Sequence, residues 1–394
     1  MKMKNTLWAV LSLVATVSMA QGTDGNVNGA DGEKTLFERV TNIEKKNDKF
    51  NMYLNMQAGL YTGFNQNGVD GFAGGAFKVP QLRLEVKGQL TDRLSYRWRQ
   101  RLNKSYAPSG PDGLPLAIDV AGVGIKATKG LSFFLGRQCV AYGGFEFDAN
   151  PIDIYKYSEL IDHQNIFMTG ITASYNFTPG QQMVFQVLNS NAKDATDFYG
   201  QNIEERRMAL VYSLGWNANM FDGLWQTRYS ASVMNETKNC NMYYVALGNL
   251  FTFSPKWNMY VDLMGSIENI DRKGMMTEII GLQDNHNVNN AMYGAVAAKL
   301  NYRFHPKWNA FVKGTYDWIG MLEGGNGYSK GLYRTALNYL AGVEFYPMHD
   351  SDLHFFCVFT GQTNLYADKA LMFNKSNYST QNASIGFIYK LPVF

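Results

Sequence analysis

From Phe50 to the end of the chain, polar and apolar residues alternate with a period of two, in one segment after another. In residues 81–90, for example, Arg83 and Lys87 alternate with apolar neighbours such as Leu84. A β-strand places successive side chains on opposite faces, so each segment has one polar and one apolar face. Strands of a soluble sandwich also alternate, so the number of segments and the links between them must decide the fold class.

The alternation predicts sixteen strands, separated by links of two kinds. The strands are expected at residues 50–61, 77–90, 94–104, 116–128, 131–139, 165–177, 181–189, 206–218, 223–235, 240–254, 257–268, 290–304, 307–319, 334–346, 352–364 and 381–391. Every second link is short and rich in turn residues, as at 91–93, whereas the others are mostly long, as at 62–76 and 140–164. Only the link after Asn235 breaks this rule, because it is short. An even number of strands with short turns at one end and long loops at the other is typical of an all-β, transmembrane antiparallel β-barrel, with the turns periplasmic and the loops extracellular.

Two further signals agree with a barrel in an outer membrane. Aromatic residues lie within a few positions of the short turns, as expected for an interfacial girdle, at Phe177, Trp225, Phe253, Trp257, Phe304, Trp308 and Phe345. The last expected strand resembles the signal that the barrel-assembly machinery reads, with Gly386, Tyr389, Leu391 and the terminal Phe394 as its elements.

The segment before the barrel is expected to consist of an export signal followed by a leader. Residues 1–20 combine Lys2 and Lys4, an apolar stretch and a small-residue cleavage site, which is the layout of a secretory signal peptide. The alternative is an anchor helix, but the apolar stretch is too short to span a bilayer. Residues 21–49 are predicted to be a periplasmic leader with one short helix, either packed on the barrel or forming a coiled-coil stem, and residues 50–394 are the barrel.

The polar face of a transmembrane barrel lines the lumen, so the alternation also assigns charges to the channel. The expected lumen cations are Arg83, Lys87, Arg97, Arg99, Arg101, Lys126, Arg207, Arg228, Lys299, Arg303, Lys313, Arg334 and Lys390, against the anions Glu85, Asp262, Asp317 and Glu344. On this count the cations outnumber the anions too far to be paired internally, which predicts an open, hydrated and anion-attracting lumen.

Arg97, Arg99 and Arg101 alternate along one expected strand and form a ladder on its lumen face. Guanidinium groups bind phosphate, sulfate and carboxylate in a bidentate manner, so a ladder offers an anion successive binding positions. The alternative is that these arginines pair with acids such as Glu85 on the next strand and only hold the wall together.

The third long link, 140–164, is the candidate constriction. It is expected to fold into the lumen because its aromatic residues would be costly in water. Its candidate residues are Tyr142, Phe145, Glu146, Asp148 and Tyr155. The alternative is an exposed surface loop of ordinary composition.

The run Phe134-Leu135-Gly136-Arg137-Gln138, followed by Ala141-Tyr142-Gly143-Gly144-Phe145-Glu146, resembles the phosphate-selective porin O and P family in its Bacteroidota form. The resemblance extends over about residues 50 to 394. It implies a sixteen-stranded, usually trimeric barrel that takes up anions through an arginine ladder, here Arg97, Arg99, Arg101 and Arg137. The family's phosphate-specific members add a lysine cluster, but this third link holds only Lys156 and five acids.

The sequence therefore predicts a porin for small hydrophilic solutes with a preference for anions such as phosphate, in the outer membrane of a Gram-negative bacterium. Its expected partners are membrane lipid and lipopolysaccharide, the barrel-assembly machinery and two further copies of itself. Neither a cofactor nor a metal is expected, and the near balance of 36 Lys+Arg against 33 Asp+Glu argues against nucleic acid. The rivals are a structural or adhesive barrel without an open pore and, because neither GxSxG nor HExxH occurs, less favourably an enzyme.

Overall fold

The structure is a computed structural model that describes residues 49–393, apart from short gaps at 67–68, 109, 191–198, 200–202, 205, 283–286, 326 and 349–350. The expected signal peptide, the leader with its short helix and the terminal Phe394 lie outside the described residues. These three interpretations therefore stay predictions.

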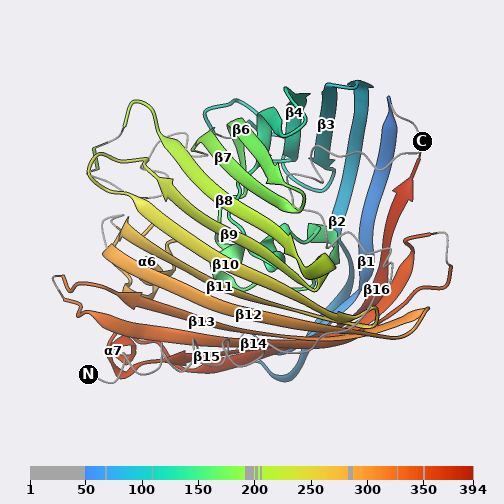
Figure 1. Cartoon of the computed structure of the whole chain (residues 1–394). Helices are drawn as coiled ribbons and strands as arrows, with labels where there is room; N and C mark the ends of the chain where they lie inside the picture. The colour runs from blue at the N-terminus through green and yellow to red at the C-terminus, as the bar shows by residue number, and fades with distance from the viewer. Residues whose placement is uncertain are drawn as a thin grey trace. The chain divides into compact units, whose positions relative to one another are not determined.

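Sixteen antiparallel strands close into one barrel, which confirms the predicted fold class (Figure 1). The strands are β1 (Asn51–Gln66), β2 (Val69–Thr91), β3 (Leu94–Arg101), β4 (Ile118–Lys126), β5 (Leu131–Cys139), β6 (Phe167–Thr178), β7 (Gln181–Asn189), β8 (Leu210–Met220), β9 (Trp225–Met234), β10 (Met242–Ser254), β11 (Trp257–Ile270), β12 (Asn289–His305), β13 (Trp308–Met321), β14 (Gly331–Phe345), β15 (His354–Tyr366) and β16 (Tyr378–Pro392). Each strand pairs with its sequence neighbours, and β1 closes the ring by pairing with β16 from Tyr53↔Pro392 to Phe64↔Gln381. All sixteen predicted strands are present.

Burial alternates along the strands in the sense expected for a membrane barrel. On β7, Gln182 and Gln186 are buried, whereas Phe185 between them is half exposed. The polar side chains therefore face the interior and the apolar ones face outward, the reverse of a soluble sandwich. This arrangement is stable only where the outward face meets lipid.

The short turns are built by local side-chain to backbone hydrogen bonds. The hydroxyl of Thr91 accepts from the backbone N–H of Arg93 and of Leu94, at 3.2 and 3.1 Å, and Thr128 accepts in the same way from Leu131 at 3.0 Å. Rings cluster beside other short turns, where the centroids of Trp257 and Tyr302 lie 3.9 Å apart in a stacked pair. These aromatic side chains lie beside the short turns, where the sequence predicts the interfacial girdle.

The first long link differs from the expectation. Residues 62–76 were predicted to be a loop, but β1 continues to Gln66 and β2 begins at Val69, so the two strands form a hairpin that extends past the predicted strand ends. Bulges between Gln57 and Gly59 and around Phe64 interrupt its register, and these irregularities obscure a period of two in the sequence.

The helices are short and lie in the long links, except for η2, which forms the short turn between β8 and β9. They are α3 (Phe145–Asp148), the 3₁₀ turn η1 (Pro151–Asp153), α4 (Glu159–Asp162), the 3₁₀ turn η2 (Phe221–Gly223), α6 (Met275–Ile280) and α7 (Asp368–Leu371). Within the part of the chain that is described, no helix has the length and apolar character needed to cross a membrane. Three of these elements, α3, η1 and α4, belong to the third link.

Candidate functional site

The predicted arginine ladder lies on the buried inner face of β3 and meets the cations of β2 across the sheet. The register pairs Arg101 with Arg83, Arg99 with Glu85, and Arg97 with Lys87. The side chains of Arg83, Arg97 and Arg99 are only 4–6% exposed. The two strands thus present five cations and one acid to the same part of the interior.

Two carboxylates balance part of this charge. The Nε atom of Arg97 lies 2.8 Å from Oε1 of Glu85, as the structural alternative for the ladder anticipated. The Nε atoms of the other three arginines face a single acid, Asp119: Arg101 at 2.9 Å, Arg99 at 3.3 Å and Arg83 at 3.6 Å. One carboxylate therefore serves three guanidinium groups, and a surplus of positive charge stays on this wall.

Asp119 was missed because a β-bulge turns it inward. Arg99 pairs with Val120 whereas Gln100 pairs with Ile118, so Asp119 is the extra residue of β4 in that pairing. Strict alternation that places Lys126 inside would place Asp119 against lipid, where an acid is unfavourable. An acid on the predicted lipid face was the signal in the sequence that could have revealed the bulge.

Arg137 occupies a separate position on the inner face of β5. Its Nη1 atom lies 2.9 Å from Oδ2 of Asp112, which belongs to the link between β3 and β4. The same carboxylate oxygen accepts the hydroxyl of Thr169 at 2.6 Å. Arg137 is thus held by its own acid, apart from the group around Asp119.

The third link folds into the barrel and crosses it; it is the teal to green segment within the ring of strands in Figure 1. Tyr142, Phe145 and Glu146 are buried, and Phe145 and Glu146 are the first two residues of α3. The backbone N–H groups of Phe145 and Glu146 donate to the two carboxylate oxygens of Asp262 on β11, at 2.9 and 2.7 Å. An acid of the far wall therefore anchors the start of this helix.

Two glycines make that entry possible. Gly143 and Gly144 have φ values of 70° and 86°, a left-handed region that other residues rarely adopt. A Cβ at Gly143 would lie 2.9 Å from the carbonyl oxygen of Arg228, and the N–H of Gly144 donates to that same oxygen at 3.0 Å. The chain turns inward here by passing close to the backbone of β9.

Four acids of the third link pair with cations from four strands. Glu146 contacts Lys313 of β13 at 2.5 Å, and Asp148 contacts Arg228 of β9 at 3.1 Å. The two remaining pairs are Asp153 with Lys390 of β16 at 2.9 Å and Glu159 with Arg334 of β14 at 2.5 Å. The link is thereby tied to opposite parts of the wall.

Apolar contacts complete this packing. Tyr142 meets Tyr244 edge to face, with centroids 5.0 Å apart, and Tyr155 stacks on Phe311 at 5.3 Å. The hydroxyl of Tyr155 donates to Glu344 at 3.0 Å. All five residues predicted for the constriction, Tyr142, Phe145, Glu146, Asp148 and Tyr155, are thus held inside the barrel.

The expectation that the lumen cations cannot be paired internally is wrong. Ion pairs hold Arg83, Lys87, Arg97, Arg99, Arg101, Arg228, Lys313, Arg334 and Lys390. Loop acids could not be assigned to the lumen from the alternation of strands, and they neutralise the cations of β9, β13, β14 and β16. Of the remaining four cations, Arg207 is exposed in the link before β8, and Lys126 and Arg303 are exposed near strand ends. The fourth, Lys299 of β12, has its Nζ atom 4.6 Å from the ring centroid of Phe311.

A second link also packs inside, which the sequence did not predict. Helix α6 follows β11, and its Met276 is fully buried with its N–H donating to the hydroxyl of Tyr293 at 3.1 Å. Before it, Arg272 binds Glu236 through Nε and Nη2, at 2.7 and 2.9 Å. The buried methionines of α6 extend the apolar cluster that holds the third link.

Lys156, the only lysine of the third link, contacts β15. Its Nζ donates to Gln362 of β15 at 2.6 Å. Burial lowers the pKa of this amine, and the charges of Glu159 and Asp162 oppose that change. The described part of the link thus supplies no cluster of lysines.

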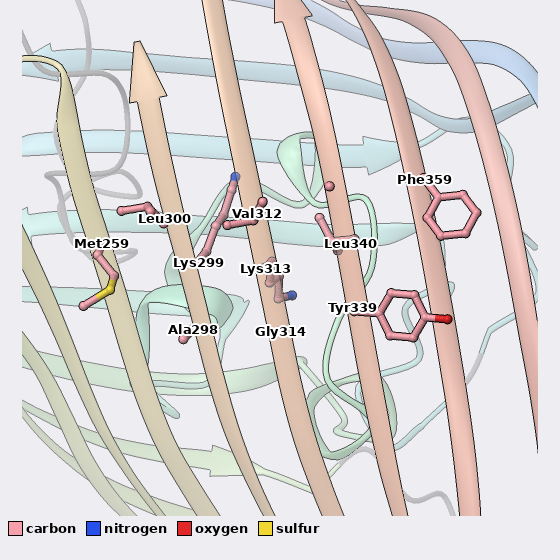
Figure 2. A pocket seen from close by; sticks show the side chains of 11 residues that line it. Met259, Ala298, Lys299, Leu300, Val312, Lys313, Gly314, Tyr339, Leu340 and Phe359 are labelled. Atoms are coloured by element: carbon pink, nitrogen blue, oxygen red, sulfur yellow. The ribbon is translucent and has the colours of Figure 1, made fainter. Parts of the chain in front are cut away.

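A hollow of about 470 Å³ in the wall does not belong to the lumen (Figure 2). Its rim carries Val312, Tyr339 and Phe359, which are 37–53% exposed and face outward. Lys313 contributes to the lining but directs its ammonium group inward to Glu146. The hollow is therefore a groove on the lipid-facing side of β11–β15.

The comparisons with known proteins agree with this geometry. The profile of the family described as "phosphate-selective porin O and P" matches residues 50–391. The chain belongs to this family. No curated protein matches the chain.

Solved structures of outer-membrane channels share the fold of this porin. The channel DcaP of Acinetobacter baumannii is similar with a TM-score of 0.59 and 11% identity, covering 87% of this chain and 97% of its own. An anion-selective porin from Comamonas acidovorans gives 0.54 and 10%, with 87% and 99% covered. The trimer form of OmpT from Vibrio cholerae gives 0.53 and 12%, with 87% and 100% covered. At these identities the likeness concerns the fold, and the family and these neighbours point to an outer-membrane channel.

Proposed function

We propose that this porin lets small hydrophilic solutes diffuse passively across the outer membrane of a Gram-negative bacterium, with a preference for anions such as phosphate. The observation that carries the proposal is the single carboxylate of Asp119 facing Arg83, Arg99 and Arg101. The surplus positive charge is concentrated on β2 and β3, whereas the third link neutralises cations elsewhere on the wall. A local excess of this kind raises the concentration of anions at one side of the lumen.

The geometry of the arginines suits oxyanions. Each guanidinium group offers five N–H donors, and in three of these groups the Nε atom faces Asp119. Nη1 of Arg83 is buried and has no hydrogen-bond partner within the described residues. Donors of this kind bind phosphate or a carboxylate in a bidentate manner, and they keep their charge at physiological pH.

The third link is proposed to form the constriction. Four of its five acids are engaged by Lys313, Arg228, Lys390 and Arg334, so these four add little negative charge for a passing anion to meet. Because Lys156 is bound to Gln362, strict selectivity for phosphate is not part of the proposal. General uptake of small anions fits these contacts better.

Single-channel recording in a KCl gradient tests this function. We expect the reversal potential to show that chloride is more permeant than potassium, most strongly in dilute salt because screening weakens the field. Replacing Arg97, Arg99 and Arg101 by glutamine should reduce that preference and leave the channel open. Arg303→Gln is the matched control, because this arginine is exposed and lies near a short turn. A cation-selective wild-type channel would contradict the proposal.

A structural or adhesive barrel without an open pore is the second candidate. The observation that favours it is the depth of burial of the ladder, since Arg83, Arg97 and Arg99 are hardly accessible and the third link packs tightly. A purified protein that inserts into planar bilayers without any conductance would support this candidate over the porin.

The proposal includes the route and the assembly of the protein. Residues 1–20 would direct export, and Gly386, Tyr389 and Leu391 on β16 would be read by the barrel-assembly machinery. In the membrane the barrel would contact lipid and lipopolysaccharide and form a homotrimer, as the trimer form of OmpT supports by its fold. Native mass spectrometry of the extracted protein tests the subunit number.

A further inference from the structure

The groove on the lipid-facing side of β11–β15 has a floor of small residues between large side chains (Figure 2). On this floor Ala298 of β12 pairs with Gly314 of β13, and Val312 pairs with Ala341 of β14. A Cβ built on Gly314 would lie 3.9 Å from the carbonyl oxygen of Asn338, so the floor has free space above the backbone. The large side chains around it are Met259, Leu300, Val312, Tyr339 and Phe359.

The lining of the groove is suited to an acyl chain. Two lysines contribute to it, but Lys313 pairs with Glu146 inside the barrel, and Nζ of Lys299 lies 4.6 Å from the ring centroid of the buried Phe311. Water in the groove would lack polar partners, and an empty groove would lose van der Waals contacts. Acyl chains surround the barrel at this level, and small floor residues let them approach the backbone closely.

Aromatic rings lie between the groove and the short turns. Trp257 stacks on Tyr302 with centroids 3.9 Å apart, and Trp308 lies 4.7 Å from Phe345. Gly314 is six residues beyond Trp308 in the sequence, which is about 20 Å along a strand. With the usual tilt of such strands, the floor reaches about the middle of the hydrocarbon core, and the rings mark its interface on the short-turn side.

Hydrogen-bond donors accompany these rings. Within the described residues, neither the indole N–H of Trp257 nor the hydroxyl of Tyr302 has a protein partner, whereas the N–H of Trp225 donates to Asn249 at 3.0 Å. Lys256 directly precedes Trp257 in the turn between β10 and β11, is exposed, and pairs with no acid in the part of the chain that is described. An ammonium group and neutral N–H and O–H donors at this level match the phosphate and ester oxygens of a phospholipid.

We propose that the β11–β15 groove binds one phospholipid of the periplasmic leaflet, with its phosphate at Lys256 and one acyl chain on the floor at Gly314. The cation, the rings and the groove follow each other in the order of phosphate, ester and chain. The volume of about 470 Å³ lies within the range of about 300–1,000 Å³ that is usual for ligand pockets. The inference rests on the proposed outer-membrane location and is independent of the anion preference, which depends on the interior.

Native mass spectrometry of the porin extracted in mild detergent tests the site. We expect one retained phospholipid for each wild-type barrel, and Gly314→Leu should reduce the retained fraction about tenfold because its side chain fills the floor. Gly265→Leu is the matched control: Gly265 pairs with the outward-facing Val245, and a Cβ there would lie 3.5 Å from the nearest atom, the carbonyl oxygen of Tyr293. Heat-modifiable migration on gels shows whether each variant is folded.

Several results of this measurement would overturn the proposal. They are a wild-type protein without retained lipid, retained lipopolysaccharide in place of phospholipid, equal retention by the two glycine variants, and a change of subunit number in Gly314→Leu, which would assign the groove to a second copy. Both variants should conduct as the wild type does, since the groove faces outward. A wild-type protein without conductance would refute the porin function and leave the lipid site standing.

The position of the phosphate has its own test. Delipidated porin is titrated with phosphatidylglycerol, and binding is followed by the same mass measurement. Lys256→Gln should weaken binding about threefold, as expected for a charge contact at an exposed site. Lys129→Gln is the control, because Lys129 is exposed in the turn between β4 and β5, far along the sheet from the groove. Equal binding by the two lysine variants would refute the placement of the phosphate at Lys256.

Discussion

Glu146 of the third link and Lys313 of β13 form a buried ion pair, with Oε1 and Nζ 2.5 Å apart. The same carboxylate accepts the N–H and the hydroxyl of Ser158, each at 2.7 Å, so it also joins the two halves of the link. Lys313 donates in addition to the carbonyl oxygen of Lys156 at 2.5 Å. This ion pair therefore anchors the third link to the barrel wall.

Glu146→Gln should loosen the third link without unfolding the barrel. Removing one partner of a buried ion pair costs about 3–5 kcal/mol because the other charge is left uncompensated. Here the cost falls on the packing of the link, so we expect larger and noisier single-channel conductance. Limited proteolysis of the folded protein should show new cleavage within residues 140–164.

The matched control replaces both partners. Glu146→Met combined with Lys313→Met leaves no buried charge, and such apolar replacements are often neutral. The double variant should therefore restore quiet conductance close to that of the wild type. If it is as noisy as Glu146→Gln alone, the charge pair is not what holds the link.

Asp119→Asn should strengthen the preference for anions. The substitution removes the carboxylate that Arg83, Arg99 and Arg101 share and leaves a side chain of similar size. The reversal potential in a KCl gradient should shift further toward that of chloride. Asp112→Asn is the comparison, because Asp112 serves Arg137 at a separate position. An unchanged or smaller anion preference for Asp119→Asn would mean that this carboxylate orients the arginines more than it neutralises them.

The strands were predictable because membrane burial forces alternation on every one of them. A side chain such as Leu84 faces lipid and its neighbour Arg83 faces the interior, and this alternation recurs along the strands except at bulges such as the one in β4. The rule is local, so it needs only the sequence of each segment. The wall of the candidate site, including the shared face of Arg97, Arg99 and Arg101, follows from it.

The remaining parts of the site depend on contacts between residues distant in sequence. Glu146 meets Lys313 and Asp153 meets Lys390, and no local pattern indicates which loop acid pairs with which strand. Asp119 was hidden by a bulge, where one extra residue reverses the alternation. These contacts explain why a count of charges on the strands overestimated the unpaired positive charge of the lumen.

Neighbouring residues on β2 should respond in opposite ways to substitution. Leu84→Arg places a cation on the lipid face, which costs about 2–4 kcal/mol at the bilayer midplane and less toward the interfaces. Arg83→Gln changes the inner face, where Asp119 still has Arg99 and Arg101, so assembly should be intact and only conduction should change. Denaturant unfolding in lipid vesicles measures the first effect, and equal stability of the two variants would refute the assignment of faces.

The seam between β1 and β16 imposes a steric requirement on Gly386. This glycine pairs with Gly59, and a Cβ there would lie 2.7 Å from the ring of Phe356 and against the carbonyl oxygen of Ala58. Gly386→Val should therefore hinder closure of the barrel and reduce the fraction that shows heat-modifiable migration. Ile385→Val is the matched control, since Ile385 is 62% exposed and its outward face has room.

Refolding from urea into detergent separates this steric effect from recognition by the assembly machinery. No machinery is present in such an experiment, so a glycine needed only as a recognition signal would be replaceable there. We expect Gly386→Val to refold poorly in detergent as well as in cells, because the obstruction lies between β1, β15 and β16 themselves. Normal refolding in detergent combined with failure in cells would instead assign Gly386 to the assembly signal, together with Tyr389 and Leu391.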